Sequence, residues 1–562
     1  MSQSEYWAAF MRRRFSRRRL LQVGAVAGTG LWIGSSLGCG EGTSEKTSGQ
    51  TGQTSPQAQG TPTPQKGGTL RITLAIGEPI GVDPFVTNHF AAPVYEKLVR
   101  QTPKRDKVIP DLATSWEIPD DVTYIFKLKP GVKFQNIPPV NGRELTAEDV
   151  KYSLERTLSE GQQYPLRSSF IFLDKVEAVD KSTVKVTTKA PFAPQLNKMA
   201  YLSDYIMPKE IVGSDNVATK AIGTGAFILD RWDKGDKMVF KRNPDYHEAG
   251  RPYLDGIEYK WAVDYVALVT VFISDQADMV TVYAQDVDTI RNKRPTAQIK
   301  QASSLSQHNY IFRSGFKPTD DIRVRQAMDL VIPRWEIALR IASGREDLYG
   351  GTATGPLPTA AENWVLPMSE LEKKPGYMKK FPKADAVAQA KRLMVDAGYA
   401  NGFDITMAQA PEPYEVLISQ MCQEWWKEIG VRLAIQPMDW ASFIAAGVKG
   451  DFQFMLYVVT GDGDPDSHLY PYLKSDSVNN WGRWNDPTLD KLLEDQRATL
   501  DFAKRKAIVY DAQRRILDQI PRMYIYDWVT FTAMHEKLRD FEPAAYSTFA
   551  GWDQFKQVWF AK

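Results

Sequence analysis

The run FDITMAQAPEPYEVLISQMCQEWWKEIGVRLAI, residues 403–435, decides the fold class. Its first part, 403–407, has the pattern of a strand, and 414–429 carries apolar residues at helical spacing. Gly430 ends the helix, and the alternating residues 431–435 follow at once as a second strand. A strand, a helix and a strand in this order predict a βαβ crossover with parallel strand pairing.

The same alternation of helices and strands extends to both sides of this run. A helix over 384–397 ends at Gly398 before it, and a shorter helix follows Asp439 after it. The strongly apolar segment 452–459 has the character of a buried strand. This order of elements is typical of an α/β domain with a largely parallel sheet.

The N-terminal half has a different pattern. Apolar residues alternate over 69–76, as in a strand with one buried face, and 123–128 is rich in strand-forming residues. The region 176–188 has the form of a hairpin around a polar turn. Between these strands Thr146 is placed to begin a helix, with Asp149 as the acidic partner of a capping box. Residues 123–188 therefore predict a self-contained α+β unit.

The N-terminus has the features of an export signal. The sequence SRRRLLQ at 16–22 precedes a glycine-rich, weakly apolar stretch that ends in Leu-Gly-Cys at Cys39. We interpret 1–38 as a twin-arginine signal with a lipobox-like end, and Cys39 as a lipidated residue. The stretch is too rich in Gly and Ser to favour a transmembrane anchor. Residues 39–67 are almost wholly small and polar, which predicts a disordered tether.

Composition excludes several classes of protein. The 562 residues have a formal charge of +2, and residues 1–38 hold six Arg and one Glu, so a chain starting at Cys39 carries about −3. This charge is not that of a nucleic-acid-binding protein. Of the two Cys, Cys422 shares an apolar helical face and is expected in the core, so no disulfide framework is expected. A folded part of about 490 residues predicts two or more lobes.

Eight sequence motifs occur in an order that resembles a known family. They are VDP (82–84), VIPDLATSWE (108–117), FKLKPGVKF (126–134), LTAEDVKYSLER (145–156), GTGAF (223–227), RNPDYHEAGRPYLD (242–255), DDIRVRQAMD (320–329) and AGYANGFDI (397–405). Together they resemble the family 5 solute-binding proteins of ABC importers, which include receptors for peptides, nickel and oligosaccharides. The resemblance runs from about Gly68 to the C-terminus.

The resemblance implies an α/β fold of the class II-like (cluster C) periplasmic-binding-protein type. Two lobes close about a hinge, and an extra domain is inserted. The implied divisions are lobe I at 68–98, 223–315 and 526–562, inserted domain II at 99–222, and lobe III at 316–525. The chain is expected to cross between the lobes near 315 and 525, and the ligand to lie between lobes I and III.

The resemblance also implies a ligand site around the loop TGDGDPD, residues 460–466. In peptide-binding members a carboxylate of this loop pairs with the α-ammonium of the ligand, and on the motif that residue is Asp462. A charge-assisted hydrogen bond in a closed cleft is strong and directional. The backbone of Val458, Thr460 and Gly461 is expected to lie beside an extended peptide, which then adds a strand.

Other interpretations of these residues remain open. The Asp residues of the loop could simply cap a turn, or bind calcium, although Ser467 and Leu473 stand where an EF-hand needs Gly and Glu. Aromatic rings could instead stack on a sugar. Three candidates near predicted loops are Trp440, Trp481 and Trp484, and the loop that contains Phe85, Asn88 and His89 matches the family's ligand-facing loop.

We therefore expect a binding protein rather than an enzyme. It would capture a short peptide outside the cytoplasm, in the periplasm or on the outer face of the membrane, and deliver it to a permease and its ATPase. We expect a lipid-anchored monomer without cofactor, metal or nucleic acid. An oligosaccharide or a nickel complex is the alternative ligand. An exported hydrolase is the alternative class, but the five His are scattered, with no H-E-x-x-H and no G-x-S-x-G. A chaperone or sensor with the same fold is a third class.

Overall fold

The computed structural model describes residues 63–562 except 76–77, 80, 86–89, 159–169, 202–204, 213–219, 263, 350–354, 411 and 545–551. The predicted signal at 1–38, the lipidated Cys39, most of the tether at 39–67, and two of the candidate site residues, Asn88 and His89, lie outside the described residues.

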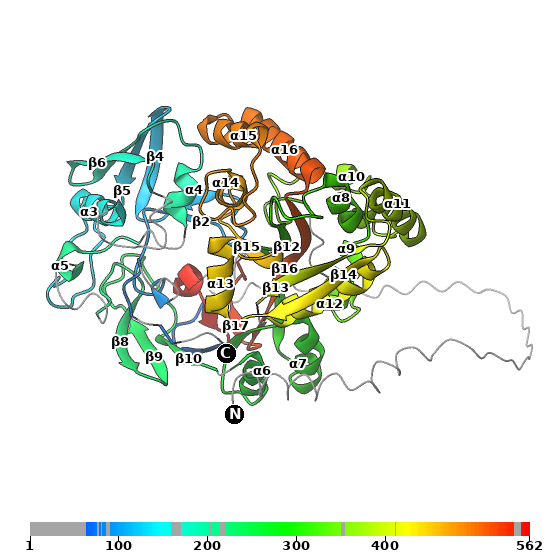
Figure 1. Cartoon of the computed structure of the whole chain (residues 1–562). Coiled ribbons are helices and arrows are strands. Elements are labelled where there is room, and N and C mark those ends of the chain that lie inside the picture. The colour runs from blue at the N-terminus through cyan, green and yellow to red at the C-terminus, as the bar shows by residue number, and fades with distance from the viewer. Residues whose placement is uncertain are drawn as a thin grey trace, which may run out of the picture. The chain divides into compact units, whose positions relative to one another are not determined.

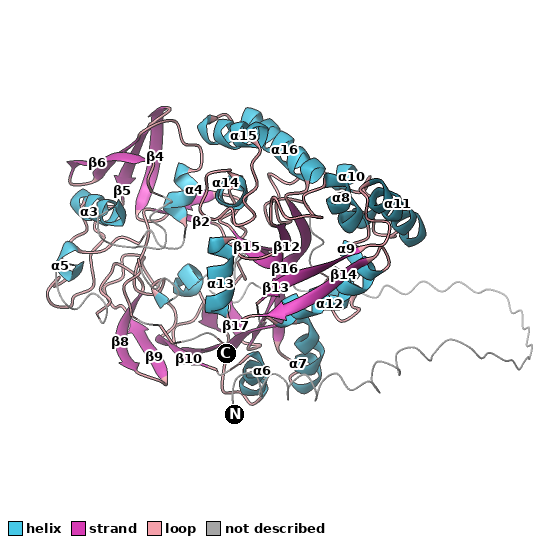
Figure 2. Cartoon of the chain, in the orientation of Figure 1, coloured by secondary structure: helices cyan, strands magenta, loops and turns pink. Residues whose placement is uncertain are grey.

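A ten-stranded sheet forms the centre of the fold (Figures 1 and 2). Its strands lie in the order β14-β13-β15-β12-β16-β11-β1-β10-β9-β8. Their bounds are β1 Thr69–Leu74, β8 Phe227–Asp233, β9 Lys237–Arg242, β10 Gly256–Trp261, β11 Met279–Val282, β12 Gln298–Phe312, β13 Phe403–Gln409, β14 Val431–Pro437, β15 Phe454–Thr460 and β16 Arg522–Met534.

The sheet is mixed rather than parallel throughout. Strand β13 pairs in parallel with both β14 and β15, as the alternation of strands and helices predicts. Strand β12 is antiparallel to β15 and β16, and β8, β9 and β10 are joined by antiparallel pairing. The expectation of a largely parallel sheet thus holds for the three strands from which it was derived. The periodicity of a strand carries no information about the direction of its neighbour.

Helices pack against this sheet through their apolar faces. Helix α12 (Pro413–Lys427) buries Ile418, Cys422 and Trp426 in one core cluster with β13 and β15, so the prediction of a core Cys422 is confirmed. Asp439 caps α13 (Trp440–Lys449) by accepting from Ser442 N at 3.1 Å. The other helices of the second half are α8 Ile322–Leu330, α9 Arg334–Ile341, α10 Met368–Leu371, α11 Lys383–Asp396, α14 Pro465–Leu473, α15 Pro487–Ala498 and α16 Phe502–Gln519, and α6 Tyr265–Ile273 and α7 Val287–Lys293 precede them.

Residues 99–222 form a sheet of their own, in the order β4-β5-β7-β6. The Thr146 backbone N–H donates to Asp149 at 3.0 Å at the start of the helix, as the capping box predicts. The elements are β2 Val99–Gln101, β3 Val108–Pro110, β4 Ala113–Asp120, β5 Thr123–Leu128, α3 Ala147–Leu158, β6 Leu173–Asp180, β7 Thr183–Thr188, α4 Gln195–Ala200 and α5 Lys209–Val212. The hydrophobic core of these residues is continuous with that around β1 and β10, so the unit predicted at 123–188 is not self-contained in its packing.

Two long strands join the two ends of the central sheet. Strands β12 and β16 pair over most of their length, and their register shifts between Ser303 and Gln307 and again between His308 and Asn309. The predicted division at 525/526 falls inside β16, and the one at 315/316 falls just after β12. The division into lobes I, II and III stays a prediction.

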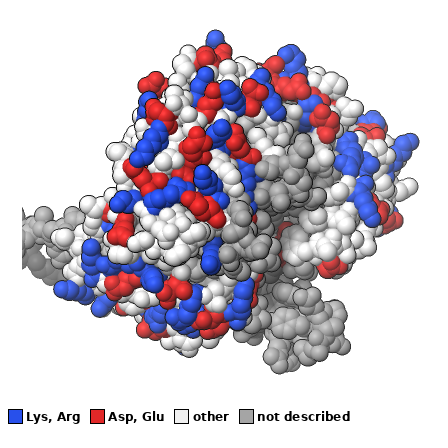
Figure 3. Space-filling model, turned by 90° about the vertical axis from the view of Figure 1, so that its left-hand side faces the viewer, with Lys and Arg blue, Asp and Glu red and all other residues white. Residues whose placement is uncertain are grey.

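The distribution of charge on the surface agrees with a chain of small net charge. On the face shown in Figure 3, basic and acidic side chains are interspersed. Among the described helices, none combines the length and the apolar character that crossing a bilayer requires.

Candidate functional site

The edge of strand β15 is the first feature of the predicted site. At its two ends Gly461 N donates to Leu305 O at 3.2 Å, and Arg313 N donates to Gln453 O at 3.3 Å across the ladder with β12. In an antiparallel ladder the hydrogen-bonded residues alternate, so those on β15 are the odd-numbered ones. The backbone N–H and C=O groups of Val458 and Thr460 therefore point away from β12.

These outward groups lie on an open edge. On this side β15 pairs with β13 only at Phe454 and Met455. Beyond Met455, no strand pairs with this edge in the part of the chain that the structure describes. Val458 and Thr460 thus present backbone donors and acceptors in the arrangement that an added strand needs.

The loop after β15 turns sharply into helix α14. Asp464 caps the helix by accepting from Asp466 N at 2.9 Å, and Asp462 accepts from Asp464 N at 3.0 Å. A Cβ at Gly461 would lie 2.1 Å from the His468 ring, and Gly463 has φ +90°. The two glycines are therefore required by close packing and by the left-handed turn.

The three acidic residues of the loop are buried, and each has a cation. Asp462 pairs with Lys198 at 3.0 Å, Asp464 with Arg505 at 2.6 Å, and Asp466 with Arg497 at 2.5 Å. Asp466 Oδ1 also accepts from Gln496 Nε2 at 2.9 Å. Each of the three carboxylates is at most 2% exposed. The loop is a balanced network of buried ion pairs.

Electrostatics favours the charged forms of Lys198 and Asp464. Burial alone lowers the pKa of Lys198, but Asp462, Asp466 and Asp464 together raise that pKa above its ordinary value. Burial raises the pKa of Asp464, and Arg505 outweighs it, so the pKa of this carboxyl is lowered. Paired charges inside a protein are stable only when each has its partner.

Lys198 comes from a distant part of the chain. It lies on α4, within residues 99–222, and α4 lies beside α14 (Figure 1). Two further contacts join the same segments, because Gln101 Nε2 donates to Asp462 O at 2.5 Å and Asn197 Nδ2 donates to Asp464 at 3.2 Å. The side of the loop that carries the Asp462 carboxylate is thus covered by residues 99–222.

Two of the three candidate tryptophans belong to one row of rings beside β15. Trp440 meets Phe443 edge-on at 5.7 Å, Phe443 stacks with Tyr457 at 6.3 Å, and Tyr457 lies 4.6 Å from Trp481. Trp440 is exposed, whereas Trp481 is buried and its indole N–H has no acceptor among the described residues.

The other aromatic candidates lie elsewhere. Trp484 lies under Arg325, with the guanidinium carbon 4.9 Å from the ring. Phe85 is buried in the core, with Arg156 over its ring at 4.7 Å, and Arg156 also pairs with Asp83 at 2.6 Å. Two of the sequence motifs therefore meet through Asp83 and Arg156.

A cavity of about 360 Å³ lies next to the loop. Residues 99–222 contribute Arg105 and Asn197 to its wall, and the second half of the chain contributes Trp364, Gly463 and Arg505. This volume is at the lower end of the range for small-molecule sites.

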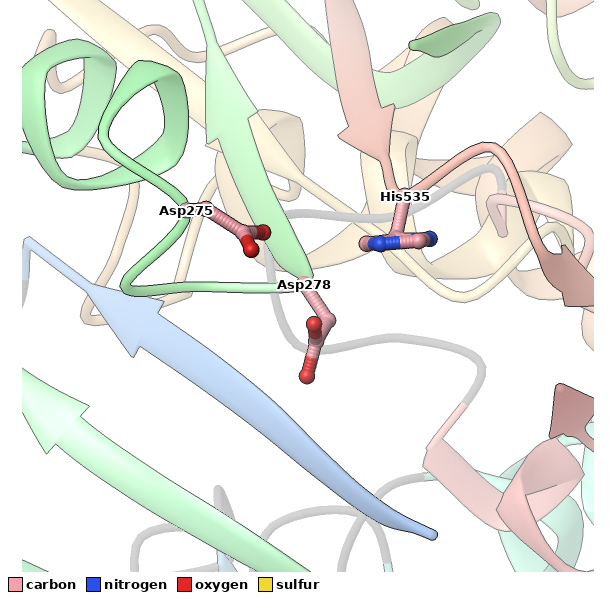
Figure 4. A group of neighbouring side chains, drawn as sticks. All are labelled: Asp275, Asp278 and His535. Atoms are coloured by element: carbon pink, nitrogen blue, oxygen red, sulfur yellow. The ribbon is translucent and has the colours of Figure 1, made fainter. Parts of the chain in front are cut away.

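One group of side chains has the composition of a metal site. Figure 4 shows Asp275, Asp278 and His535, whose potential ligand atoms lie within 4.8 Å of one another. Arg71 binds Asp278 with two side-chain nitrogens at 2.7 and 3.0 Å, and Arg294 binds Asp275 at 3.0 Å. Both carboxylates are already paired with an arginine, so we interpret this group as one that stabilises the fold and not as a metal site.

A family model decides what kind of protein carries this site. The model for bacterial extracellular solute-binding proteins, family 5 middle region, matches residues 107–480, about two-thirds of the chain. The chain belongs to this family. The resemblance read from the motifs is confirmed, and so is the fold class. Family 5 consists of solute-binding proteins and not of enzymes.

Relatives of this family 5 protein cover nearly its whole folded part. Di/tripeptide-binding protein 1 of Pseudomonas aeruginosa is 27% identical over 85% of this chain and 92% of its own length. A solved structure of the periplasmic binding protein DppA from Helicobacter pylori with the peptide STSA has a TM-score of 0.72 at 22% identity, covering 89% of this chain and 99% of that one. AgaA from A.tumefacien R10, solved with agropinic acid, has a TM-score of 0.70 at 26% identity over 88% and 99%.

Sequence reasoning about this family 5 protein located the strand and the loop but missed the partners of the loop. Lys198, Arg497 and Arg505 are 264, 31 and 41 residues from their carboxylates. The motif TGDGDPD pointed to Asp462 as a ligand-binding carboxylate, but the helix that contains Lys198 has no pattern that points to this loop.

Proposed function

We propose that this protein is an extracytoplasmic receptor that captures a short peptide for an ABC importer. The observation that carries the proposal is the open edge of β15, where Val458 and Thr460 present their backbone groups outward. Membership of family 5 and the di/tripeptide-binding relative support the same class of ligand.

The edge suits a peptide because it forms hydrogen bonds with the main chain of the ligand. An extended peptide beside Val458 and Thr460 gains the hydrogen bonds of a sheet, whatever its side chains are. In the neighbouring row of rings, the exposed Trp440 and the half-buried Tyr457 offer apolar surface for those side chains. The indole N–H of Trp481, beside Tyr457, has no acceptor among the described residues. The backbone of β15 then supplies the affinity for peptides, and the rings determine which peptide side chains are preferred.

Capture in this proposal is a shift between two states of the protein. The irregular pairing of β12 and β16 at Ser303 to Asn309 is the place where the sheet can bend. Ligand stabilises the closed state by the contacts that it makes only there. The closed protein then docks on a permease, whose ATPase drives transport.

The proposal extends to the cellular setting of the protein. We propose export by the twin-arginine signal at 1–38, a lipid on Cys39 and a tether at 39–67 that holds a monomeric receptor near its permease. Metabolic labelling with a radioactive fatty acid tests the anchor. Label in the native protein and none in Cys39→Ala is the expected result, and equal label in both contradicts it.

The ligand class can be tested by thermal unfolding of the full chain with di- to pentapeptides and with cello- and malto-oligosaccharides. A ligand at about 100 times its Kd adds about 2.7 kcal/mol to the stability of the folded state. Stabilisation by peptides supports the proposal. Stabilisation by sugars alone contradicts it and makes the row of rings the binding surface.

A further inference from the structure

The carboxylate of Asp462 has both of its oxygens occupied from within the protein. Oδ2 lies 3.0 Å from the Lys198 ammonium, and Oδ1 accepts from Asp464 N at 3.0 Å. The Asp462 residue is 2% exposed and Lys198 is 8% exposed. The pair is buried, so neither solvent nor salt screens it as on a surface.

Charge balance in the loop leaves no place for another cation. Arg505 takes both oxygens of Asp464, and Arg497 takes both oxygens of Asp466. Lys198 is the third cation, at 3.0 Å from Asp462 and 4.0 Å from Asp466. A fourth positive group at Asp462 would have to expel Lys198 and leave its ammonium buried without a partner, which is strongly unfavourable.

Lys198 is also held in place by its own element. It lies one turn of α4 after Pro194, whose carbonyl accepts from Lys198 N at 2.9 Å. Its neighbour Asn197 bonds Asp464, and Gln101 bonds both Asn197 and the carbonyl of Asp462. The Lys198 ammonium is therefore held beside Asp462 by the packing of α4 against the loop, and its position does not depend on the side chain folding in from solvent.

We propose that Lys198 is the resident counter-ion of Asp462, and that the receptor consequently takes peptides whose amino end carries no free ammonium group. This inference rests on the proposed function and narrows its ligand class. An N-acylated peptide presents an amide there, which brings no charge to the loop. Its N–H and C=O can still pair with the open edge of β15 at Val458 and Thr460.

The opposite arrangement is a Lys198 that holds the site only until the ammonium of a peptide replaces it. The two arrangements differ in one measurable preference. If Lys198 stays in place, a free amino terminus weakens peptide binding. If the peptide ammonium displaces Lys198, a free amino terminus strengthens binding.

The experiment compares two matched tripeptide libraries, one with free amino ends and one N-acetylated, by isothermal titration calorimetry on the full chain. We expect the native protein to bind the acetylated library at least roughly tenfold more tightly. We expect Lys198→Met, which frees the Asp462 carboxylate, to reverse this preference. Lys175→Met, on an exposed pair with Glu177 in the same segment, is the control and should change neither affinity.

A double variant keeps the test valid if Lys198→Met alone fails to fold. Lys198→Met with Asp462→Asn removes both charges together, and we expect it to fold and to retain the preference for acetylated peptides. Tighter binding of the free-amino library by the native protein overturns the inference and leaves the peptide receptor standing. Binding of neither library overturns the proposed function, and the inference with it.

Discussion

At the scale of single residues, this protein buries several charged side chains in its interior. The three acids of the TGDGDPD loop are among them, and each depends on one cation from another element. Such pairs add little net stability, yet removing one partner is costly because the other charge stays buried. The loop is therefore more sensitive to single substitutions than its length suggests.

The Asp464–Arg505 pair offers a direct test of this sensitivity. We expect Asp464→Ala to lower the free energy of unfolding by about 3–5 kcal/mol, because Arg505 is left buried without its carboxylate. Urea unfolding measures the change. Asp495→Ala, in the exposed pair with Lys491, is the matched control and should have little effect. Equal, small effects of the two substitutions would show that the loop network is not buried in solution.

Glu415 predicts how stability depends on pH. This side chain on α12 is 1% exposed, its Oε2 has no partner among the described residues, and burial together with Glu412 raises its pKa from 4.5 to about 9. Between these pH values the folded state keeps a proton that the unfolded state has lost, so this group makes stability fall as pH rises.

We expect Glu415→Gln to keep the shape of the neutral acid and to flatten this dependence. Urea unfolding at pH 5, 7 and 9 should show the variant gaining on the native protein as the pH rises, by about 1–3 kcal/mol at the upper end. His308, whose pKa burial lowers from 6.5 to about 4, makes stability rise with pH between these values. It does so equally in the native protein and the variant, so it cancels in their comparison. Parallel pH profiles of the two proteins would place the titration of Glu415 near its ordinary value.

At the scale of elements, the open edge of β15 can be tested by removing one N–H group. We expect Val458→Pro to weaken peptide binding at least roughly tenfold while the protein still folds, because the lost donor faces the edge and not β12. Val459→Pro is the matched contrast. It removes a donor that faces β12, so it should lower the unfolding temperature instead. The reverse result, in which Val459→Pro weakens binding and Val458→Pro lowers the unfolding temperature, would show that the even-numbered residues of β15 face β12.

Many elements could be predicted from the sequence because their patterns are local. The strand at 123–128 coincides with β5, the helix at 384–397 differs from α11 by one residue at each end, and the capping box at Thr146 forms. The direction of β12 beside β15 and the shared core of residues 99–222 could not be predicted, because they depend on contacts between distant segments.

The candidate site divides in the same way. Val458 and Thr460 lie on a strand whose apolar run identifies it, and Asp462 lies in a motif of recognisable composition. Lys198 stands in the segment QLNKMA, where a lysine is ordinarily a surface residue. Its partner is 264 residues away, so only the folded chain reveals that the loop carries its own ammonium.

At the scale of the whole molecule, residues 99–222 are docked on the second half of the chain by a few polar contacts around the loop. Gln101 bonds the Asp462 carbonyl, Asn197 bonds Asp464, and Ala193 N donates to Arg497 O at 2.7 Å. These contacts exist only while the two parts are together. Under the proposed mechanism of capture, they contribute to the free energy of closing and not to that of folding either part.

We expect the double variant Gln101→Ala, Asn197→Ala to close less readily without unfolding. Lost docking contacts lower the fraction of closed molecules, and the apparent Kd rises in proportion to that loss, since only closed molecules hold the ligand fully. We anticipate a roughly tenfold weaker apparent affinity for tripeptides, with an unfolding temperature near that of the native protein.

Small-angle X-ray scattering of the double variant should show a larger radius of gyration than that of the native protein before ligand is added. At saturating ligand the two values should converge. Lys175→Ala, exposed on the same segment, controls for the loss of side-chain mass. Unchanged scattering together with unchanged affinity would mean that the docking of residues 99–222 is independent of capture, and that closure is governed by β12 and β16 alone.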